Sequence, residues 1–288
     1  MAAVRSLGIP RSPDTASVIA GGASRRIVVC ADDFGIAPRS SKAILRLAEI
    51  RAISAITVLV DGESTAEHAS GVRALSPEVT VGLHFSLTEK LQGQAFGTLG
   101  SLLLRTYVFR KIDRVRLLGE IGRQCDRFET LFGRPPDFVD GHEHVHQLPI
   151  IREVFTAAIL ARFHTRIAVR TTRSRVGRGV KASVIAALGG TALGTELCRL
   201  GIPANDDFAG VYDFSTRVPY AARMEKWLKD IADHGLIMCH PQLPDPMRPA
   251  PAREAEFAYL ESAAWRDLRL RQNVSLIPFR AQSTARTS

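Results

Sequence analysis

Two adjacent carboxylates, Asp32 and Asp33, follow the apolar run 27–31 and are themselves followed by Phe34 and Gly35. Two like charges at the end of a buried strand are costly, because burial and mutual repulsion both raise the pKa of a carboxyl group. A bound cation offsets this cost, since it is often the largest local charge in a site. The pair therefore indicates a metal site or a helix N-cap.

Histidines and a further carboxylate follow other apolar runs. His84 ends "VGLH", His240 ends "LIMCH", and Asp140, His142, His144 and His146 follow "DFV". Histidine and carboxylate are ligands of a divalent ion such as Zn²⁺, and two His with one Asp leave positions for water, as catalytic zinc sites do. The spacing in "HEHVH" directs at least two imidazoles to one side on either a strand or a helix.

The elements that would carry these residues alternate between strand and helix. Strands are predicted at residues 26–32, 53–60, 78–87, 166–170, 235–241 and 273–279. A further strand is predicted to begin at residue 137, and residues 202–210 are predicted to form a short strand or a loop. Helices are predicted between them. Seven or eight such units favour an α/β fold that is a distorted (β/α) barrel of parallel strands, similar to a TIM barrel. Its strands end at one face, so Asp32, Asp33, His84, His142 and His240 should converge there.

Composition indicates a globular chain with a sizeable core. Hydrophobic residues make up 45% and charged residues 23% of the 288 residues, which is ordinary for such proteins. We predict one barrel domain over residues 26–280, with disordered tails at 1–25 and 281–288. The four scattered cysteines, none in a CxxC pair, favour reduced residues over a disulfide framework.

No apolar run reaches the ~20 residues of a membrane span or resembles a signal peptide, so a cytoplasmic location is expected.

A formal net charge of +9 permits attraction to nucleic acid, an anionic membrane or an acidic substrate. Arginines concentrate in 110–116 and 170–181, which we interpret as a solvated face or loop. Aromatic residues do not interleave with the second cluster, so nucleic-acid binding is not expected. The sequence also lacks a G-x-S-x-G elbow, a phosphate-binding loop and a dinucleotide fingerprint.

Four motifs together resemble the YdjC-like carbohydrate deacetylases, which include chitooligosaccharide deacetylases and hopanoid-associated members. They are "ADDFG", "VGLHFSLTE", "GRPPDFVDGHEHVHQLP" and "MCHP", in family order, and the resemblance covers about residues 26 to 280. It implies a distorted (β/α) barrel and metal-dependent removal of an N-acetyl group from an amino sugar. One position departs, because Glu143 stands where some members have another His, and this leaves the substrate preference open.

The resemblance also implies roles for individual residues. Asp33, His84 and His142 would bind one divalent ion, Mg²⁺ or Zn²⁺. Asp32 would be the general base, and His240, held protonated near carboxylates, the general acid that protonates the departing amine. We further expect Asp140, His144 and His146 to contact the substrate, an N-acetylated sugar, oligosaccharide or glycolipid.

Two other readings of the sequence remain. One is a metal-dependent hydrolase of another amide, an ester or a phosphoester. The other is a basic binder of nucleic acid or of a membrane surface with a vestigial metal site, whose binding should collapse with added salt. Peripheral membrane contact and a homodimer are also left open by the sequence.

Overall fold

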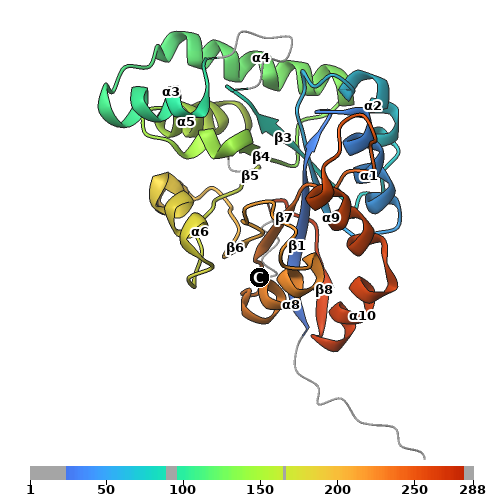
Figure 1. Ribbon diagram of the computed structural model, residues 1–288. Helices are drawn as coiled ribbons and strands as arrows, with labels where there is room; N and C mark the ends of the chain where they lie inside the picture. The colour runs from blue at the N-terminus through green and yellow to red at the C-terminus, as the bar shows by residue number, and fades with distance from the viewer. Residues whose placement is uncertain (1–23, 89–95, 165–166, 282–288) are drawn as a thin grey trace, which may run out of the picture.

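A parallel sheet, shown in a computed structural model (Figure 1), forms the frame of the protein. The structure describes residues 24–88, 96–164 and 167–281, so nearly all of both predicted tails lies outside the described residues. The strands are β1 (Arg25–Phe34), β2 (Ala55–Val58), β3 (Thr80–Phe85), β4 (Phe138–Gly141), β5 (Ala168–Val169), β6 (Phe208–Ala209), β7 (Leu236–Cys239) and β8 (Val274–Leu276).

The strand order is β5-β4-β3-β2-β1-β7-β6, and β8 pairs with the first residues of β1. Every pairing in this sheet is parallel. β5 and β6 end the hydrogen-bonded path and do not pair with each other within the described part of the chain. The sheet is thus a curled, incomplete (β/α) barrel, which confirms the predicted fold class.

Helices cover the outer, convex side of the sheet (Figure 1). The longer ones are α1 (Pro38–Glu49), α2 (Thr65–Arg73), α4 (Arg114–Phe132), α5 (Ile151–Phe163), α7 (Thr191–Leu200), α8 (Tyr220–Asp230), α9 (Pro251–Glu261) and α10 (Ala263–Arg271). The short helices α3 (Leu99–Leu103) and α6 (Val180–Ile185) run on into the π-helical turns η1 (Leu104–Val108) and η4 (Ala186–Gly190). Within the described residues, no helix is long and apolar enough to cross a membrane.

The helix boundaries follow local chemistry. In α4 the side chain of Asp113 accepts a hydrogen bond from the amide of Arg116, and Gly133 ends the helix with a left-handed φ of 69°. α9 and α10 are separated at Ser262, which is extended, and α5 begins at Ile151, two residues beyond Pro149.

Alternate residues along each strand face opposite sides of the sheet. On β1, Ile27, Val29 and Ala31 belong to the large core beneath the helices, whereas Val28 and Cys30 belong to a smaller core inside the curled sheet. This inner core also includes Phe138, Phe208, Met238 and Phe279. Because this core fills the concave side of the sheet, it supports the inward-facing side chains that follow at the carboxyl ends of the strands.

The inner core should carry a large share of the stability. Phe138 has no exposed surface and its ring centroid lies 5.0 Å from that of Phe279. We expect Phe138→Ala to lower the free energy of unfolding by about 3–5 kcal/mol, because it leaves a cavity in packed surroundings. Urea denaturation measures this loss. Val115→Ala, at a position 83% exposed, should change it by about 0.5 kcal/mol or less; equal losses in both variants would contradict the assignment.

Candidate active site and metal centre

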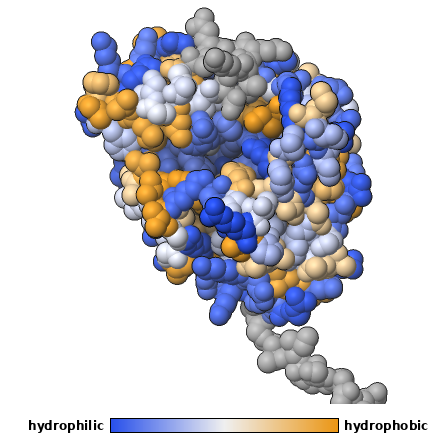
Figure 2. Space-filling view, viewed as in Figure 1, coloured by the Kyte–Doolittle hydropathy of each residue, from blue (hydrophilic) through white to orange (hydrophobic). Residues whose placement is uncertain are grey.

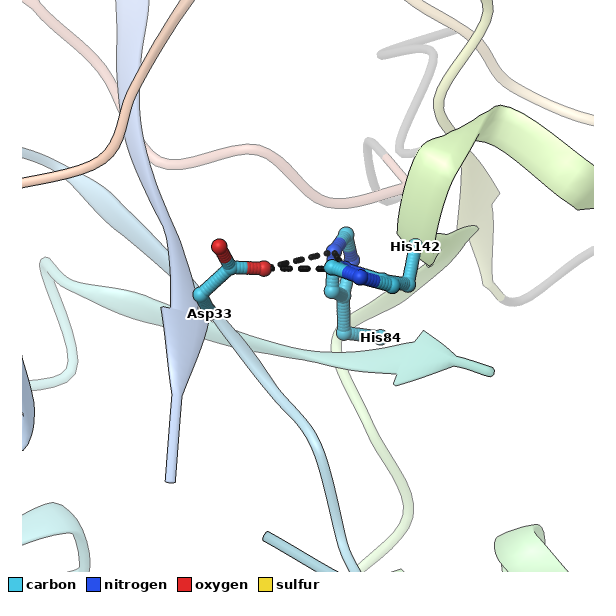
Figure 3. A group of neighbouring side chains, drawn as sticks. All are labelled: Asp33, His84 and His142. Carbon is cyan, nitrogen blue, oxygen red and sulfur yellow. Dashed lines mark hydrogen bonds and ion pairs between the residues drawn. The ribbon is translucent and has the colours of Figure 1, made fainter. Parts of the chain in front are cut away.

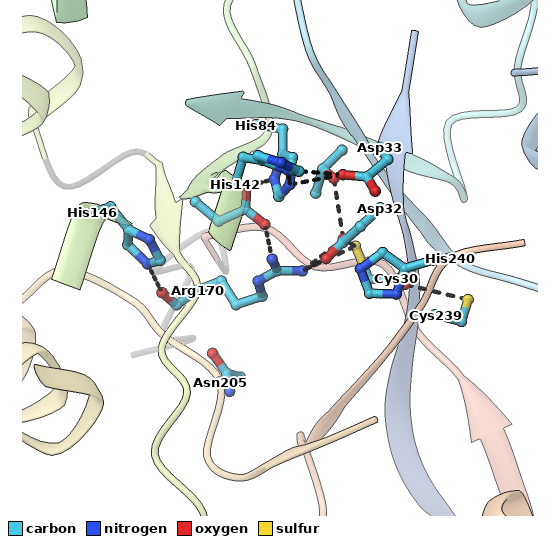
Figure 4. Close-up of polar contacts among 12 residues, drawn as sticks. Cys30, Asp32, Asp33, His84, His142, His146, Arg170, Asn205, Cys239 and His240 are labelled. Atoms are coloured by element: carbon cyan, nitrogen blue, oxygen red, sulfur yellow. Dashed lines mark hydrogen bonds and ion pairs between the residues drawn. The ribbon is translucent and has the colours of Figure 1, made fainter. Parts of the chain in front are cut away.

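The polar residues of the site continue the inward-facing rows of the strands. Each lies two positions beyond an inward-facing residue, in the pairs Cys30 and Asp32, Gly82 and His84, Phe138 and Asp140, Ala168 and Arg170, and Met238 and His240. A period of two therefore places all five polar side chains on the concave side, at the carboxyl ends of the strands. Figure 4 shows Asp32, His84, Arg170 and His240 grouped together.

Asp33 reaches the same site through a distortion of β1. In a regular strand it would face the helices, as Ala31 does. The register shows one extra residue in β1, because Ala31 pairs with Ile56 but Phe34 pairs with Val58. Asp33 adopts a left-handed φ of 68°, which is uncommon for a residue other than glycine. This bulge turns both adjacent carboxylates toward one cavity, and such strain is typical of functional sites.

Asp33, His84 and His142 bring three ligand atoms together (Figure 3). His142 Nδ1 lies 3.0 Å from Asp33 Oδ1 and 3.3 Å from His84 Nε2. His84 Nε2 lies 3.5 Å from Asp33 Oδ1. Ligand atoms at tetrahedral zinc distances would be separated by about 3.4 Å. Two imidazoles and a carboxylate in this arrangement fit a divalent transition ion.

Asp140 fixes the orientation of His84. These residues are register partners on β3 and β4, and His84 Nδ1 lies 2.6 Å from Asp140 Oδ1. Nδ1 therefore donates to the carboxylate, which leaves Nε2 to face Asp33 and His142. Although burial alone would lower the pKa of His84, Asp140 and Asp33 raise it to about 9. A metal ion must displace that proton, so metal binding should weaken as the pH falls.

Arg170, which follows the end of β5, contacts both Asp32 and Asp140. Its side chain is fully buried, with Nη1 at 2.7 and 2.8 Å from the oxygens of Asp32 and Nη2 at 2.8 Å from Asp140 Oδ2. The angle of the Asp140 contact is not that of a hydrogen bond, so this contact is an ion pair. The sequence interpretation placed Arg170 in a solvated cluster and was wrong here, since its position after an apolar strand is the signal shared by His84 and His240.

The environment of Asp32 keeps it ionised. Burial would raise the pKa of its carboxyl group, but Arg170 and His84 together lower it below the usual range. Thr57 also donates a hydrogen bond to Asp32 at 3.1 Å. The side chain lines the cavity, so an anionic oxygen faces the space beside the metal-ligand group.

A second set of side chains, Asp32, His84 and Asp140, also brings three ligand atoms close together. In this set, however, His84 Nδ1 already donates to Asp140, and Arg170 already supplies a positive charge to both carboxylates. A cation there would have to displace or oppose the guanidinium. The set formed by Asp33, His84 and His142 is therefore better suited to hold an ion.

His240 enters the cavity from the end of β7, and it corrects one expectation. Burial lowers the pKa of this imidazole to about 4, and the nearby Asp33 and Asp32 do not offset that effect. The residue is therefore neutral at pH 7 and not held protonated as the sequence analysis expected. Its ring packs edge-on against Phe214, with the centroids 5.2 Å apart.

Glu256 on α9 holds the backbone of His240. Its buried carboxylate accepts hydrogen bonds from the amide of His240 and from the hydroxyl of Tyr212. Burial raises the pKa of Glu256 to about 7 despite these two donors. A carboxyl group far along the sequence thus positions a site residue, which no local pattern in the sequence could indicate.

The three residues expected to contact substrate lie in different places. His144 lines the cavity, and its ring packs against Phe208. Asp140 and His146 have no exposed surface, and neither lines the cavity. His146 Nε2 lies 2.9 Å from the carbonyl oxygen of Arg170. Asp140 and His146 are therefore placed to position other site groups, and only His144 is placed to touch a bound molecule.

The cavity above these groups has a volume of about 640 Å³ and appears as a blue hollow in Figure 2. Its polar floor consists of Asp32, Asp33, His84, His142, Arg170 and His240. Leu99, Val184, Tyr212 and Phe214 contribute an apolar wall. Leu99 is the first residue of α3, so this short helix borders the cavity.

Arg253 is a further cavity residue that the sequence did not reveal. It reaches the site from α9, and its Nη2 donates to Asp33 Oδ2 at 3.0 Å, on the opposite oxygen from the one that faces the histidines. The guanidinium also lies 5.7 Å from the centroid of Phe214. Arg253 therefore fixes the rotation of the Asp33 carboxylate.

The chain is similar to one known family and to several known proteins. The family model described as YdjC-like protein matches residues 26–270. A chitooligosaccharide deacetylase of Serratia marcescens is 34% identical over 135 residues, which is 43% of this chain and 52% of that protein. A carbohydrate deacetylase of Homo sapiens is 35% identical over 168 residues, or 54% and 50% of the two chains. The aligned region thus spans about half the length of these relatives.

Two solved structures show that the fold recurs. A putative cellobiose-phosphate cleavage protein from Enterococcus faecalis superposes with a TM-score of 0.65 at 18% identity, over 89% of this chain and 98% of that one. An uncharacterized protein from Agrobacterium tumefaciens gives a TM-score of 0.52 at 11% identity, over 90% and 89%. At these identities the likeness concerns the fold alone.

Glu256 should make stability depend on pH. Its pKa is about 7 in the folded protein and about 4.3 in an unfolded chain, so the folded state binds the additional proton between these values. Stability from this group is present below the unfolded pKa and lost as the pH rises to 7, by up to about 1.4 kcal/mol per pH unit. Denaturant unfolding measured between these two pH values should show the free energy of unfolding falling as the pH rises. Glu256→Gln should remove the part of this pH dependence that comes from Glu256.

Glu254→Gln on the same helix is the matched control and should retain the slope. If Glu256→Gln left the pH dependence of unfolding unchanged, the buried carboxyl would not be the titrating group.

Proposed function

Because this chain belongs to the YdjC-like protein family, we propose that it removes an N-acetyl group from an amino sugar within an oligosaccharide or glycolipid. The observation that carries the proposal is the set of ligand atoms on Asp33, His84 and His142, which opens on a cavity that Asp32 and His240 also line. The activities named for the relatives, on chitooligosaccharides and carbohydrates, support the substrate class.

One divalent ion would be held by Asp33 Oδ1, His84 Nε2 and His142 Nδ1. When bound, such an ion polarises a carbonyl group and lowers the pKa of a water molecule. The two imidazoles favour Zn²⁺ or another transition ion over Mg²⁺, which normally prefers oxygen ligands. Arg253 and Asp140 would keep the carboxylate and the His84 ring in the orientation that binding needs.

Asp32 is proposed to accept a proton from the water that attacks the acetyl carbon. The new bond joins that oxygen to the carbon, the C–N bond breaks, and the amine leaves with one added proton. The products are acetate and the free amino sugar. Arg170 lowers the pKa of Asp32, so Asp32 is ionised and ready to accept but is a weak base. A bound ion would therefore have to supply much of the activation of the water.

His240 is proposed to donate the proton to the departing amine. Since burial keeps it neutral in the free protein, it must acquire this proton in the reacting complex. Negative charge that develops on the former carbonyl oxygen raises the pKa of a neighbouring imidazole. The proton released from water is the natural source, so no net proton has to enter from solvent.

Acetate release is the direct test of this activity. We expect purified protein to release acetate from at least one member of a panel of N-acetylated sugars, oligosaccharides and glycolipids, and to stop when a chelator removes metal. Adding metal back should restore release. If the protein hydrolysed only acetyl esters or phosphoesters, the proposed deacetylase activity would be wrong and the protein would be a different metal-dependent hydrolase. The predicted cytoplasmic location and the open question of a homodimer are outside this test.

The proposed ligands can be tested by metal content. We expect His84→Ala and His142→Ala to lose stoichiometric metal, because each removes one of the imidazole ligands. Atomic absorption on dialysed protein measures this, and His164→Ala, which changes a histidine at the end of α5, should keep the wild-type content. Full occupancy in both site variants would refute the assignment.

Substitutions of Asp32 and of Asp33 should impair different properties of the protein. Asp32→Asn should keep the metal and lose about 10²–10⁴-fold in kcat, the usual contribution of a general base. Asp33→Asn should instead lower metal affinity, which a competition assay with a chromogenic chelator can follow. If Asp32→Asn stayed within about threefold of wild type, Asp32 would not be the base.

The role of His240 predicts a dependence on the leaving group. His240→Ala should retain metal and bind substrate, yet lose about 10²-fold or more in rate on an acetamide. It should lose much less on an activated acetyl ester, whose leaving group needs little protonation. An equal loss on both substrates, with the fold intact by circular dichroism, would leave His240 as a positioning residue.

A further inference from the structure

Exposed apolar side chains are concentrated in three segments of the chain, two of which also contribute residues to the lining of the cavity. Among the described residues, fourteen large hydrophobic side chains are exposed, and eleven of them belong to three segments: 104–118, 173–184 and 213–218. We call these three segments the cleft-rim face. Its exposed apolar members are Leu104, Tyr107, Val108, Phe109, Val115, Leu118, Val176, Val180, Val184, Phe214 and Val218. Since scattered exposed apolar residues are normal, it is this clustering that needs an explanation.

Two of the three segments of the cleft-rim face, 173–184 and 213–218, contribute residues to the lining of the cavity, and the third follows α3, whose first residue also lines it. Leu99, which begins α3, and Val184 and Phe214 line the cavity itself. In Figure 1, α3 and α6 lie on the same side of the molecule, at the left, with α3 above α6. Figure 2 shows apolar side chains at the left of the same view, beside the polar hollow.

The same segments are strongly basic. They contain ten Lys and Arg residues against two Asp residues. Arg178 is neutralised by the buried Asp207, and Arg114 pairs with Glu153 on α5. Arg110, Lys111, Arg173 and Arg217 are exposed. Basic residues mixed with exposed Val, Leu and Phe are typical of surfaces that lie at the interface of an anionic membrane.

We propose that the cleft-rim face docks on the surface of an anionic lipid bilayer. The apolar side chains of η1 and α6 would enter the boundary between headgroups and acyl chains, and the basic residues would contact lipid phosphates. A second copy of the chain fits this face less well, because two such surfaces would repel each other through like charges. Docked in this way, the cavity opens toward the headgroups. The proposal does not depend on the proposed deacetylase activity.

Vesicle binding tests the proposal directly. Full-length protein is sedimented with vesicles of phosphatidylcholine mixed with phosphatidylglycerol, and with vesicles of phosphatidylcholine alone. We expect binding to the anionic vesicles that weakens as salt is added, because charge and apolar burial both contribute. Phe109→Glu combined with Val180→Glu should weaken the apparent affinity about tenfold or more, since two apolar anchors become acidic.

The chain offers a matched control pair. Ile50 and Leu270 are exposed apolar residues at the ends of α1 and α10, outside the cleft-rim face. Ile50→Glu combined with Leu270→Glu changes the net charge by the same amount and should weaken binding much less. Phe109→Ser combined with Val180→Ser removes the apolar groups without adding charge, and should still weaken binding several-fold.

Three results would overturn the proposal. The first is no binding of wild-type protein to anionic vesicles at low salt. The second is an equal loss in the cleft-rim pair and in the control pair, which would indicate a charge effect with no specific face. The third is a dimer in light scattering that Phe109→Glu with Val180→Glu dissociates, which would assign the face to a second copy. Melting curves of each variant verify that the fold persists.

Discussion

The contact of Arg170 with Asp32 and Asp140 is the interaction on which the site depends. One fully buried guanidinium neutralises two buried carboxylates that would otherwise repel each other and resist ionisation. Each carboxylate then has a separate task. Asp140 orients His84, and Asp32 presents an anionic oxygen to the cavity. The positive charge also disfavours a cation among Asp32, His84 and Asp140, so the neighbouring set with Asp33 and His142 is left to hold one.

The fold produces this contact by simple means. Strands β1, β3, β4, β5 and β7 each carry an inward-facing residue followed two positions later by a polar residue of the site. Since parallel strands end at the same edge, residues more than two hundred positions apart become neighbours. Asp33 does not follow this pattern, and the bulge in β1 brings it to the site. The strain at Asp33 is offset by a core that holds β1 on both faces.

The sequence was informative where a local pattern carried the signal. Polar residues after apolar strands predicted that Asp32, Asp33, His84, His142 and His240 would meet, and the structure places all five at one cavity. Arg170 carried the same signal but was hidden by its neighbours, since Arg173, Arg175 and Arg178 made the region look like a solvated cluster. Arg253 and Glu256 could not be found in this way, because their contacts depend on how α9 packs against the strand ends.

The protonation states were the least predictable feature. Near carboxylates, a histidine is expected to gain a proton, and His84 follows this rule because Asp140 contacts it directly. His240 does not, because burial outweighs the more distant Asp33 and Asp32. Charge counts along a sequence contain no measure of burial or of contact distance. The two imidazoles therefore differ in charge for reasons that only the packing reveals.

Anomalous X-ray scattering from crystals loaded with Zn²⁺ or Co²⁺ is the measurement that tests the central claim most directly. The account predicts one strong peak in contact with Asp33 Oδ1, His84 Nε2 and His142 Nδ1, about 2.0–2.2 Å from each, while Arg170 keeps its contacts with Asp32 and Asp140. A peak among Asp32, His84 and Asp140, with Arg170 displaced, or no peak in the cavity at saturating metal, would contradict it.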